Sequence, residues 1–298
     1  MTIKKIVCYL SGASAKDEAG QLADRAAATT AVTLAKTFDA GLRFQHVAID
    51  PMRAMPLMGE GMTGAMAARL TEDLESSAEE SKAAARALYQ EITTTGSLPT
   101  LAEGEEAPIG RFSVGLDIEV GVEEEVMANR ARLADLTVLG QAGRKSGESS
   151  LVLEQTLFDG GRPVLLAPDQ GMELMPKRMA VAWNGSAEAS RAVALAMPVL
   201  RRAEEVVVIS GEGPDAPASA QPSALADLLS AHGITASTWR YQPDDWPVAR
   251  SLMDETRKAG AGLLVMGAYG HSRMREMLLG GATREAIKAH DLAILMVH

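Results

Sequence analysis

The chain has 298 residues, of which 47% are hydrophobic and 23% charged, and its formal net charge is −10. This apolar fraction excludes disorder over most of the length, and no run approaches the roughly 18 apolar residues of a membrane-crossing helix. The negative charge and the 4% aromatic content argue against binding to nucleic acid. We therefore expect about two globular domains, and the single cysteine, Cys8, fits a reducing cytoplasm.

The first part of the chain has the longer connections. An apolar run at residues 6–10 predicts a buried strand. A long helix with an acidic exposed face is expected at about residues 65–94, followed by a loop at 96–110. Before that helix, residues 51–64 are rich in Met and Gly. They form either a surface loop or an adaptable contact surface, because Met side chains repack easily.

From residue 178 onward, short apolar runs alternate with segments of helical spacing. Strands are expected at 178–183, 205–210, 234–241, 261–266 and 292–297, and helices at 187–203, 223–232, 248–258 and 283–289. This alternation predicts a parallel sheet that is covered on both faces. Right-handed crossovers then give a doubly wound, flavodoxin-like α/β domain of about five strands in the order 3-2-1-4-5.

The two parts of the chain repeat each other in the same order. A basic pair, an apolar run and a turn occur at residues 4–12 and again at 177–185. A second matching pair of segments, ending in Gly-x-x-Gly, occurs at residues 134–143 and 261–270. The repetition indicates two copies of one kind of domain.

We place these two domains at residues 1–170 and 176–298. Each ends in an apolar strand, at 163–166 and 293–297. Such closing strands are natural sheet edges, and an uncovered edge invites aggregation. We therefore expect the two strands to pair or pack across the domains as an intramolecular pseudo-dimer, and two chains could associate further as a homodimer.

A ligand crevice is predicted in the second domain. In an open parallel sheet, ligands bind beyond the carboxyl ends of the strands, where the strand order reverses. Asn184-Gly185-Ser186 follows the first strand there, and Gly267-Ala268-Tyr269-Gly270 ends the fourth. Gly280-Gly281-Ala282-Thr283 opens the last helix, whose free N–H groups favour an anion. The alternative is that these glycines only form tight turns.

These residues resemble a known pattern. Gly267-x2-Gly270, nine residues, and then Gly280-Gly281-Ala282-Thr283 is similar to the universal stress protein motif Gly-x2-Gly-x9-Gly-(Ser/Thr). The run 181–186 resembles that family's opening strand and turn, and the whole chain resembles the tandem form. The resemblance implies binding of ATP, with or without Mg²⁺, by the following nucleotide-binding residues: Ala182, Asn184, Met266, Gly267, Gly270, Gly280, Gly281 and Thr283.

The sequence departs from the pattern at several positions. Gly281 stands where the pattern prefers Ser or Thr, and Asn184 replaces the usual aspartate. An amide can still bond an adenine edge as donor and acceptor. In the first domain Leu153 stands ten positions beyond Gly143, where the motif needs a glycine. We therefore expect the first domain to bind nucleotide weakly or not at all.

The sequence contains no visible nucleophile–base pair and no cluster with metal-ligand spacing. We expect a cytoplasmic stress-response protein whose contacts change with the bound adenine nucleotide, as the resemblance implies. Two alternatives stay open: a nucleotide-free interaction scaffold that uses residues 51–64, and a slow ATPase. Trp183 and Tyr269 either flank an adenine ring or serve packing.

Overall fold

The computed structural model describes residues 2–50, 64–102, 104–141, 148–211, 221–242, 248–268 and 291–298. The strands are β1 (Lys5–Leu10), β2 (Gly41–Ile49), β3 (Ser113–Gly121), β4 (Leu136–Leu139), β5 (Val164–Leu166), β6 (Arg178–Ala182), β7 (Glu205–Gly211), β8 (Ala236–Tyr241), β9 (Leu263–Gly267) and β10 (Ala293–Val297). The helices are α1 (Glu18–Phe38), α3 (Gly64–Thr95), α4 (Glu123–Arg132), α5 (Glu148–Gly160), α6 (Ala187–Leu200), α7 (Pro222–Ala231) and α8 (Val248–Lys258).

All ten strands form one sheet in the order β3-β2-β1-β4-β5-β10-β9-β6-β7-β8. We call the part up to β5 the N-terminal half and the part from β6 the C-terminal half. Within each half the paired strands are parallel and follow the order 3-2-1-4-5. The predicted α/β fold class is confirmed.

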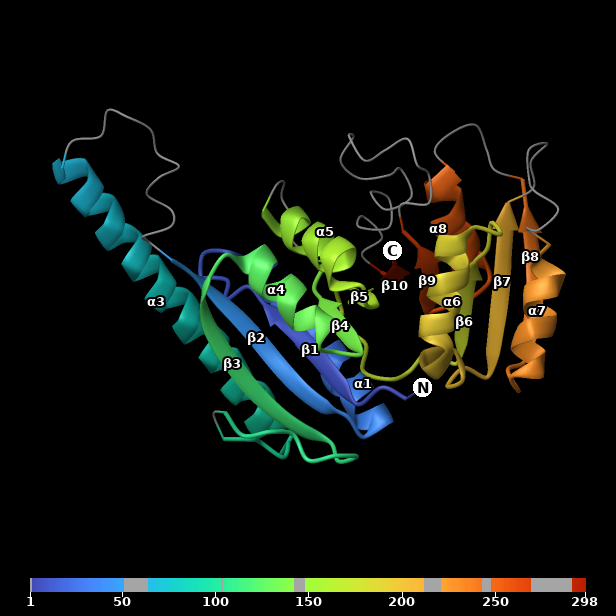
Figure 1. Cartoon of the computed structure of the whole chain (residues 1–298), viewed down its shortest axis with the longest axis horizontal. Helices are drawn as coiled ribbons and strands as arrows, with labels where there is room; N and C mark the ends of the chain where they lie inside the picture. The colour runs from blue at the N-terminus through green and yellow to red at the C-terminus, as the bar shows by residue number, and fades with distance from the viewer. Residues whose placement is uncertain are drawn as a thin grey trace.

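The two halves meet where β5 pairs with β10, in the middle of the molecule (Figure 1). This pair is antiparallel, with Leu165 opposite Leu295. Both side chains are almost completely buried. The two closing strands therefore pair with each other, as the sequence predicted, and neither remains an open edge.

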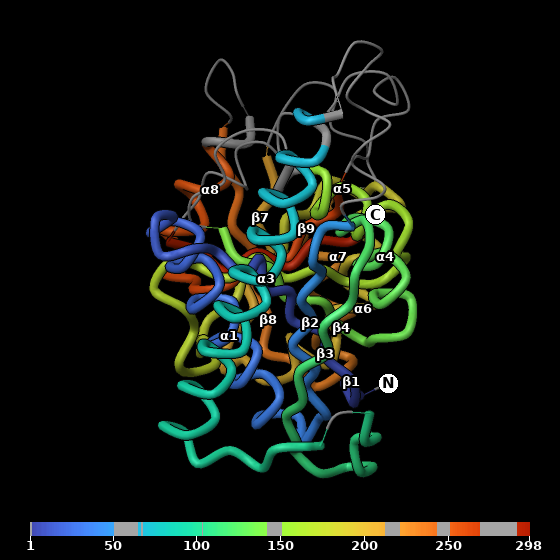
Figure 2. Tube along the Cα trace, turned by 90° about the vertical axis from the view of Figure 1, so that its left-hand side faces the viewer, coloured from blue at the N-terminus to red at the C-terminus, as the bar shows by residue number. Residues whose placement is uncertain are grey.

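Two hydrophobic clusters cover the two faces of the sheet. One contains residues of α1, α6 and α7, and Leu88 and Ile92 of α3 pack against it. The other contains residues of α4, α5 and α8. Each cluster includes strand residues from both halves, so the core is continuous across the β5–β10 pair. Figure 2 views the molecule from the end where α3 lies against β2.

The helices agree with the expected periodicity, since α3, α7 and α8 begin and end within two residues of their predicted bounds. In the described ranges, no helix is long and apolar enough to cross a membrane. Residues 51–63 and the last predicted helix, at 283–289, lie outside the described part. The connection between the halves is held against α1, because the Met172 amide donates to Thr30 Oγ1 over 2.9 Å.

Candidate functional site

The candidate site of the C-terminal half lies where β6 and β9 end. These strands are parallel neighbours with Val181 opposite Val265, so both end at the same edge of the sheet. Ala182 is the last residue of β6 and Gly267 the last of β9. Two of the predicted nucleotide-binding residues thus lie at one edge, at the point where the strand order reverses.

The turn after β6 leads directly into helix α6. Asn184 Oδ1 accepts a hydrogen bond from the Ser186 amide over 3.0 Å, and Gly185 has a φ of 72°. This left-handed conformation favours glycine. Ser186 Oγ then caps α6 by accepting from the Ala189 amide over 3.2 Å. Asn184, which follows β6 at this edge of the sheet, is exposed.

Gly267 packs closely against the first turn of α6. A Cβ atom added to it would lie 2.6 Å from the Ala189 nitrogen and 2.6 Å from the Glu188 carbonyl carbon. No side chain fits there without a shift of the backbone. This close contact places the end of β9 beside the start of α6, which begins at Ala187, three residues after Asn184. Asn184 and Gly267 therefore belong to one cluster of loops.

The side chains of two other residues considered for the site, Met266 and Trp183, pack into the core. Met266 is buried in the cluster that contains α8, so only its backbone can contact a ligand. Trp183 packs against the core cluster that contains α6, and its amide donates to the Ile209 carbonyl over 2.8 Å. Its buried indole N–H has no partner among the described residues. This placement favours the packing interpretation of Trp183.

The remaining predicted residues, Gly270, Gly280, Gly281 and Thr283, lie outside the described residues, as does Tyr269. Among the described residues there is no group of three or more His, Cys, Asp or Glu side chains able to hold a metal ion.

At the corresponding edge of the N-terminal half, the loop after β1 binds a buried carboxylate. Asp24 in α1 is only 6% exposed and accepts hydrogen bonds from the loop after β1. Burial raises the pKa of Asp24 from 3.8 to about 6, although the hydrogen bonds from Ser11, Ala13 and Gly12 act in the opposite direction. Burial, followed by the charge of Asp24, also raises the pKa of Cys8. Cys8 is thus a buried core residue, as predicted.

A histidine supports the same loop from the other side. His46 Nδ1 lies 3.0 Å from the Leu10 carbonyl oxygen, and its Nε2 lies 3.1 Å from Ser81 Oγ. The Leu10 carbonyl can only accept, so Nδ1 carries the proton. Burial lowers the pKa of His46. Gly12 is confined between this ring and the Ser81 carbonyl, and its φ of 67° is again left-handed.

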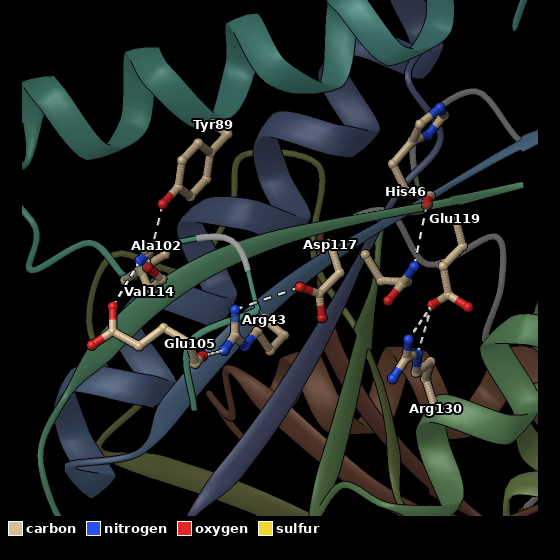
Figure 3. A network of polar contacts seen from close by, with 10 residues as sticks. Arg43, His46, Tyr89, Ala102, Glu105, Val114, Asp117, Glu119 and Arg130 are labelled. Atoms are coloured by element: carbon tan, nitrogen blue, oxygen red, sulfur yellow. Dashed lines mark hydrogen bonds and ion pairs between the residues drawn. The ribbon is translucent and has the colours of Figure 1, made fainter. Parts of the chain in front are cut away.

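Ion pairs join the outer strands β2 and β3 of the N-terminal half to each other and to α4 (Figure 3). Arg43 of β2 lies 3.5 Å from Asp117 of β3 and donates to the Glu105 carbonyl. Glu119 of β3 accepts from Arg130 Nε of α4 over 2.7 Å. These charges bind each other along the sheet edge, and we assign no ligand to them.

The sequence interpretation missed Asp24 and His46. Asp24 carries a readable signal, because it lies three and four positions before Ala27 and Ala28 on the apolar face of α1. An acid on that face must find hydrogen-bond partners. The partners of His46 come from distant parts of the chain, and no local spacing indicates them.

No protein-family model matches the sequence, and no curated protein matches it. Among solved structures, a universal stress protein from Archaeoglobus fulgidus DSM 4304 is 14% identical with a TM-score of 0.56, covering 98% of this chain and 97% of that one. The chain has the universal stress protein fold. A putative universal stress protein from Pseudomonas aeruginosa UCBPP-PA14 is 12% identical with a TM-score of 0.55, covering 99% and 93%. A functionally unknown protein from Pseudomonas aeruginosa PAO1 has a TM-score of 0.56 at 12% identity, covering 99% and 92%.

Proposed function

We propose that this chain is a tandem universal stress protein, with domains at residues 1–170 and 176–298, whose C-terminal half binds ATP or a related adenine nucleotide. The observation that carries the proposal is the contact of Gly267 with the first turn of α6. It joins the beginning of the glycine motif to the turn that contains Asn184. The motif residues that follow, Gly270 and Gly280, continue from that point in the sequence.

The described part of the site fits the uncharged end of a nucleotide. The exposed Asn184 amide offers both a donor and an acceptor to a base. Glu188, in the first turn of α6, accepts from its own backbone N–H, which lowers the pKa of its carboxyl group. The Glu188 carboxylate pairs with Arg191 over 2.9 Å, so this turn offers a phosphate no unpaired cation. The phosphates therefore belong to the backbone amides of Gly270 to Thr283, where glycines permit a close approach.

Bound ATP would supply a charged tail whose presence changes the shape of this edge. The chain's own residues position the ligand and exclude others, and we assign no catalytic group. As the resemblance implies, we expect binding to alter contacts with protein partners in a stress response.

Equilibrium dialysis of the full chain with labelled ATP tests this proposal. We expect one nucleotide per chain and a loss of binding in Gly270→Val, because a branched side chain blocks the approach of phosphate. Gly143→Val is the matched control in the first Gly-x-x-Gly, and it should bind like the parent. Equal binding by Gly270→Val and the parent would refute the assignment, and no binding by a folded parent would favour the nucleotide-free scaffold. Phosphate release over hours with Mg²⁺ would identify the slow ATPase.

A further inference from the structure

Four hydrogen-bond donors of one loop converge on the carboxylate of Asp24. The Ser11 amide donates to Oδ1 over 2.8 Å, and the Ser11 hydroxyl donates to Oδ2 over 3.0 Å. The amides of Gly12 and Ala13 donate to the same Oδ2 over 3.0 and 3.4 Å. Three consecutive backbone N–H groups that point to one anion form the concave arrangement that binds phosphate and other oxyanions in many proteins.

The partners of the Asp24 carboxylate are these donors and not a cation. In the described part of the chain, no Lys or Arg forms an ion pair with Asp24, and the neighbouring Arg25 is paired with Glu91. The other titratable or charged groups around the loop are Cys8 on β1, His46 on β2, and Lys82 and Arg86 of α3, which act on His46. A buried charge is costly unless it is hydrogen-bonded. The loop therefore supplies the anion with hydrogen-bond donors that offset part of the cost of its burial.

The position of this carboxylate results from the register of α1. Six of the nine buried positions of α1 match the six buried positions of α6 at a constant offset: Asp24, Ala27, Ala28, Ala31, Leu34 and Ala35 align with Ala189, Ala192, Val193, Ala196, Val199 and Leu200. In this alignment α1 begins four residues earlier than α6, slightly more than one helical turn. Gly140 contacts Ala23 as Gly267 contacts Glu188, which supports the same alignment.

We infer that Ser11–Ala13 is an anion-binding cradle and that Asp24 is its built-in ligand, which keeps small oxyanions away from this edge of the N-terminal half. The Asp24 carboxylate fills the place of an external anion, whereas the equivalent residue of α6, Ala189, has no polar side chain. This inference concerns the N-terminal half and holds whether or not the C-terminal half binds nucleotide.

Chemical rescue tests the inference at a pH of about 7.5, where Asp24 is ionised. In full-length Asp24→Ala, the amides of Ser11 to Ala13 lose their acceptor, and their hydrogen exchange should accelerate by about tenfold or more. Formate should restore slow exchange and raise Tm, whereas chloride at equal ionic strength should not. Leu34→Ala, a buried substitution in the same helix, is the matched control, and formate should have no specific effect on it.

Asp24→Asn keeps the test decisive if Asp24→Ala does not fold. Its side chain fills the cradle but directs an NH₂ group toward N–H donors, so exchange should accelerate without rescue by formate. The inference is overturned if these amides exchange no faster in either variant, or if formate acts equally on Leu34→Ala.

Discussion

Asp24 in α1 holds the position that Ala189 holds in α6, although the two helices pack on equivalent strands of the same sheet. In α1 the helix begins at Glu18, more than a turn before Asp24, and Asp24 supplies a buried carboxylate. In α6 the helix begins at Ala187, so Ala189 lies in its first turn at the sheet edge. This difference makes the two sheet edges chemically unlike, although the strand order of the two halves is the same.

The first prediction concerns the pH dependence of stability. Burial raises the pKa of Asp24 to about 6 from 3.8, so the folded chain binds this proton more tightly than the unfolded chain. The stabilising contribution is therefore largest below the unfolded pKa and is lost as pH rises through about 6. Relative to Asp24→Asn, the parent should gain about 2 kcal/mol of unfolding free energy between pH 7 and pH 4.5.

Urea unfolding of both proteins across this pH range measures the difference. The lowered pKa of His46 acts in the opposite direction, because the unfolded chain takes up its proton first as pH falls. Both proteins contain His46, so its effect cancels in the comparison. A difference that stays constant with pH would show that Asp24 titrates normally.

The second prediction concerns the two close glycine contacts. Gly267→Ala and Gly140→Ala each place a Cβ against backbone atoms of the adjacent helix. Each should destabilise the fold by about 1–3 kcal/mol, as overpacking of a rigid site does. Gly121→Ala is the control, because its added Cβ meets only a Val126 side-chain methyl at 3.2 Å. Thermal unfolding should rank both test variants below Gly121→Ala, and an equal Tm for all three would contradict the packing.

The third prediction concerns Gln141, a fully buried residue that joins the two halves. Its Nε2 donates to the Leu292 carbonyl over 2.9 Å, so a side chain of the N-terminal half holds the start of β10. Gln141→Met keeps most of the volume and loses this hydrogen bond. It should lower the unfolding free energy by about 1 kcal/mol, because the lost hydrogen bond is partly offset by removal of Gln141 Oε1, which is buried without a partner among the described residues. Denaturant titration measures this loss, and a stability equal to the parent would show that the bond contributes nothing.

The fourth prediction concerns the β5–β10 pair. Because both core clusters include residues from both halves, the parent should unfold in one transition. Leu295→Asp places a charge opposite Leu165 in a buried pair, where an unpaired charge is costly. We expect two separate transitions by circular dichroism and tryptophan fluorescence in this variant. A single, coincident transition at the parental midpoint would show that the two halves do not depend on this pair.

Most of the fold could be predicted from the sequence, because short apolar strands and amphipathic helices have distinct periods. The strand order and the pairing of the two closing strands followed from the repeat and from the need to cover an edge. The position of the site residues at the sheet edge could be predicted in part. Gly267 contacts the first turn of α6, and Asn184 lies in the turn before it, whereas the nucleotide-binding role of both residues, the domain boundaries and the nucleotide itself stay predictions.

The contact between Asp24 and the loop after β1 could not be predicted from the sequence. The missing glycine at Leu153 predicted a weaker nucleotide site there, but it gave no reason for the loop of Ser11 to Ala13 to bind a carboxylate. That contact depends on a carboxylate at a helical position where α6 has Ala189. Helix ends are set by capping residues such as Asp17, whose effect on register becomes visible only against the packed sheet.

Hydrogen exchange of the full chain with and without ATP is the most direct test of a nucleotide site confined to one half. The account predicts slower exchange at residues 183–189 and 266–268 when ATP is present, with no change at residues 11–13. Protection at residues 11–13, or no protection at the loops around Asn184 and Gly267, would contradict it.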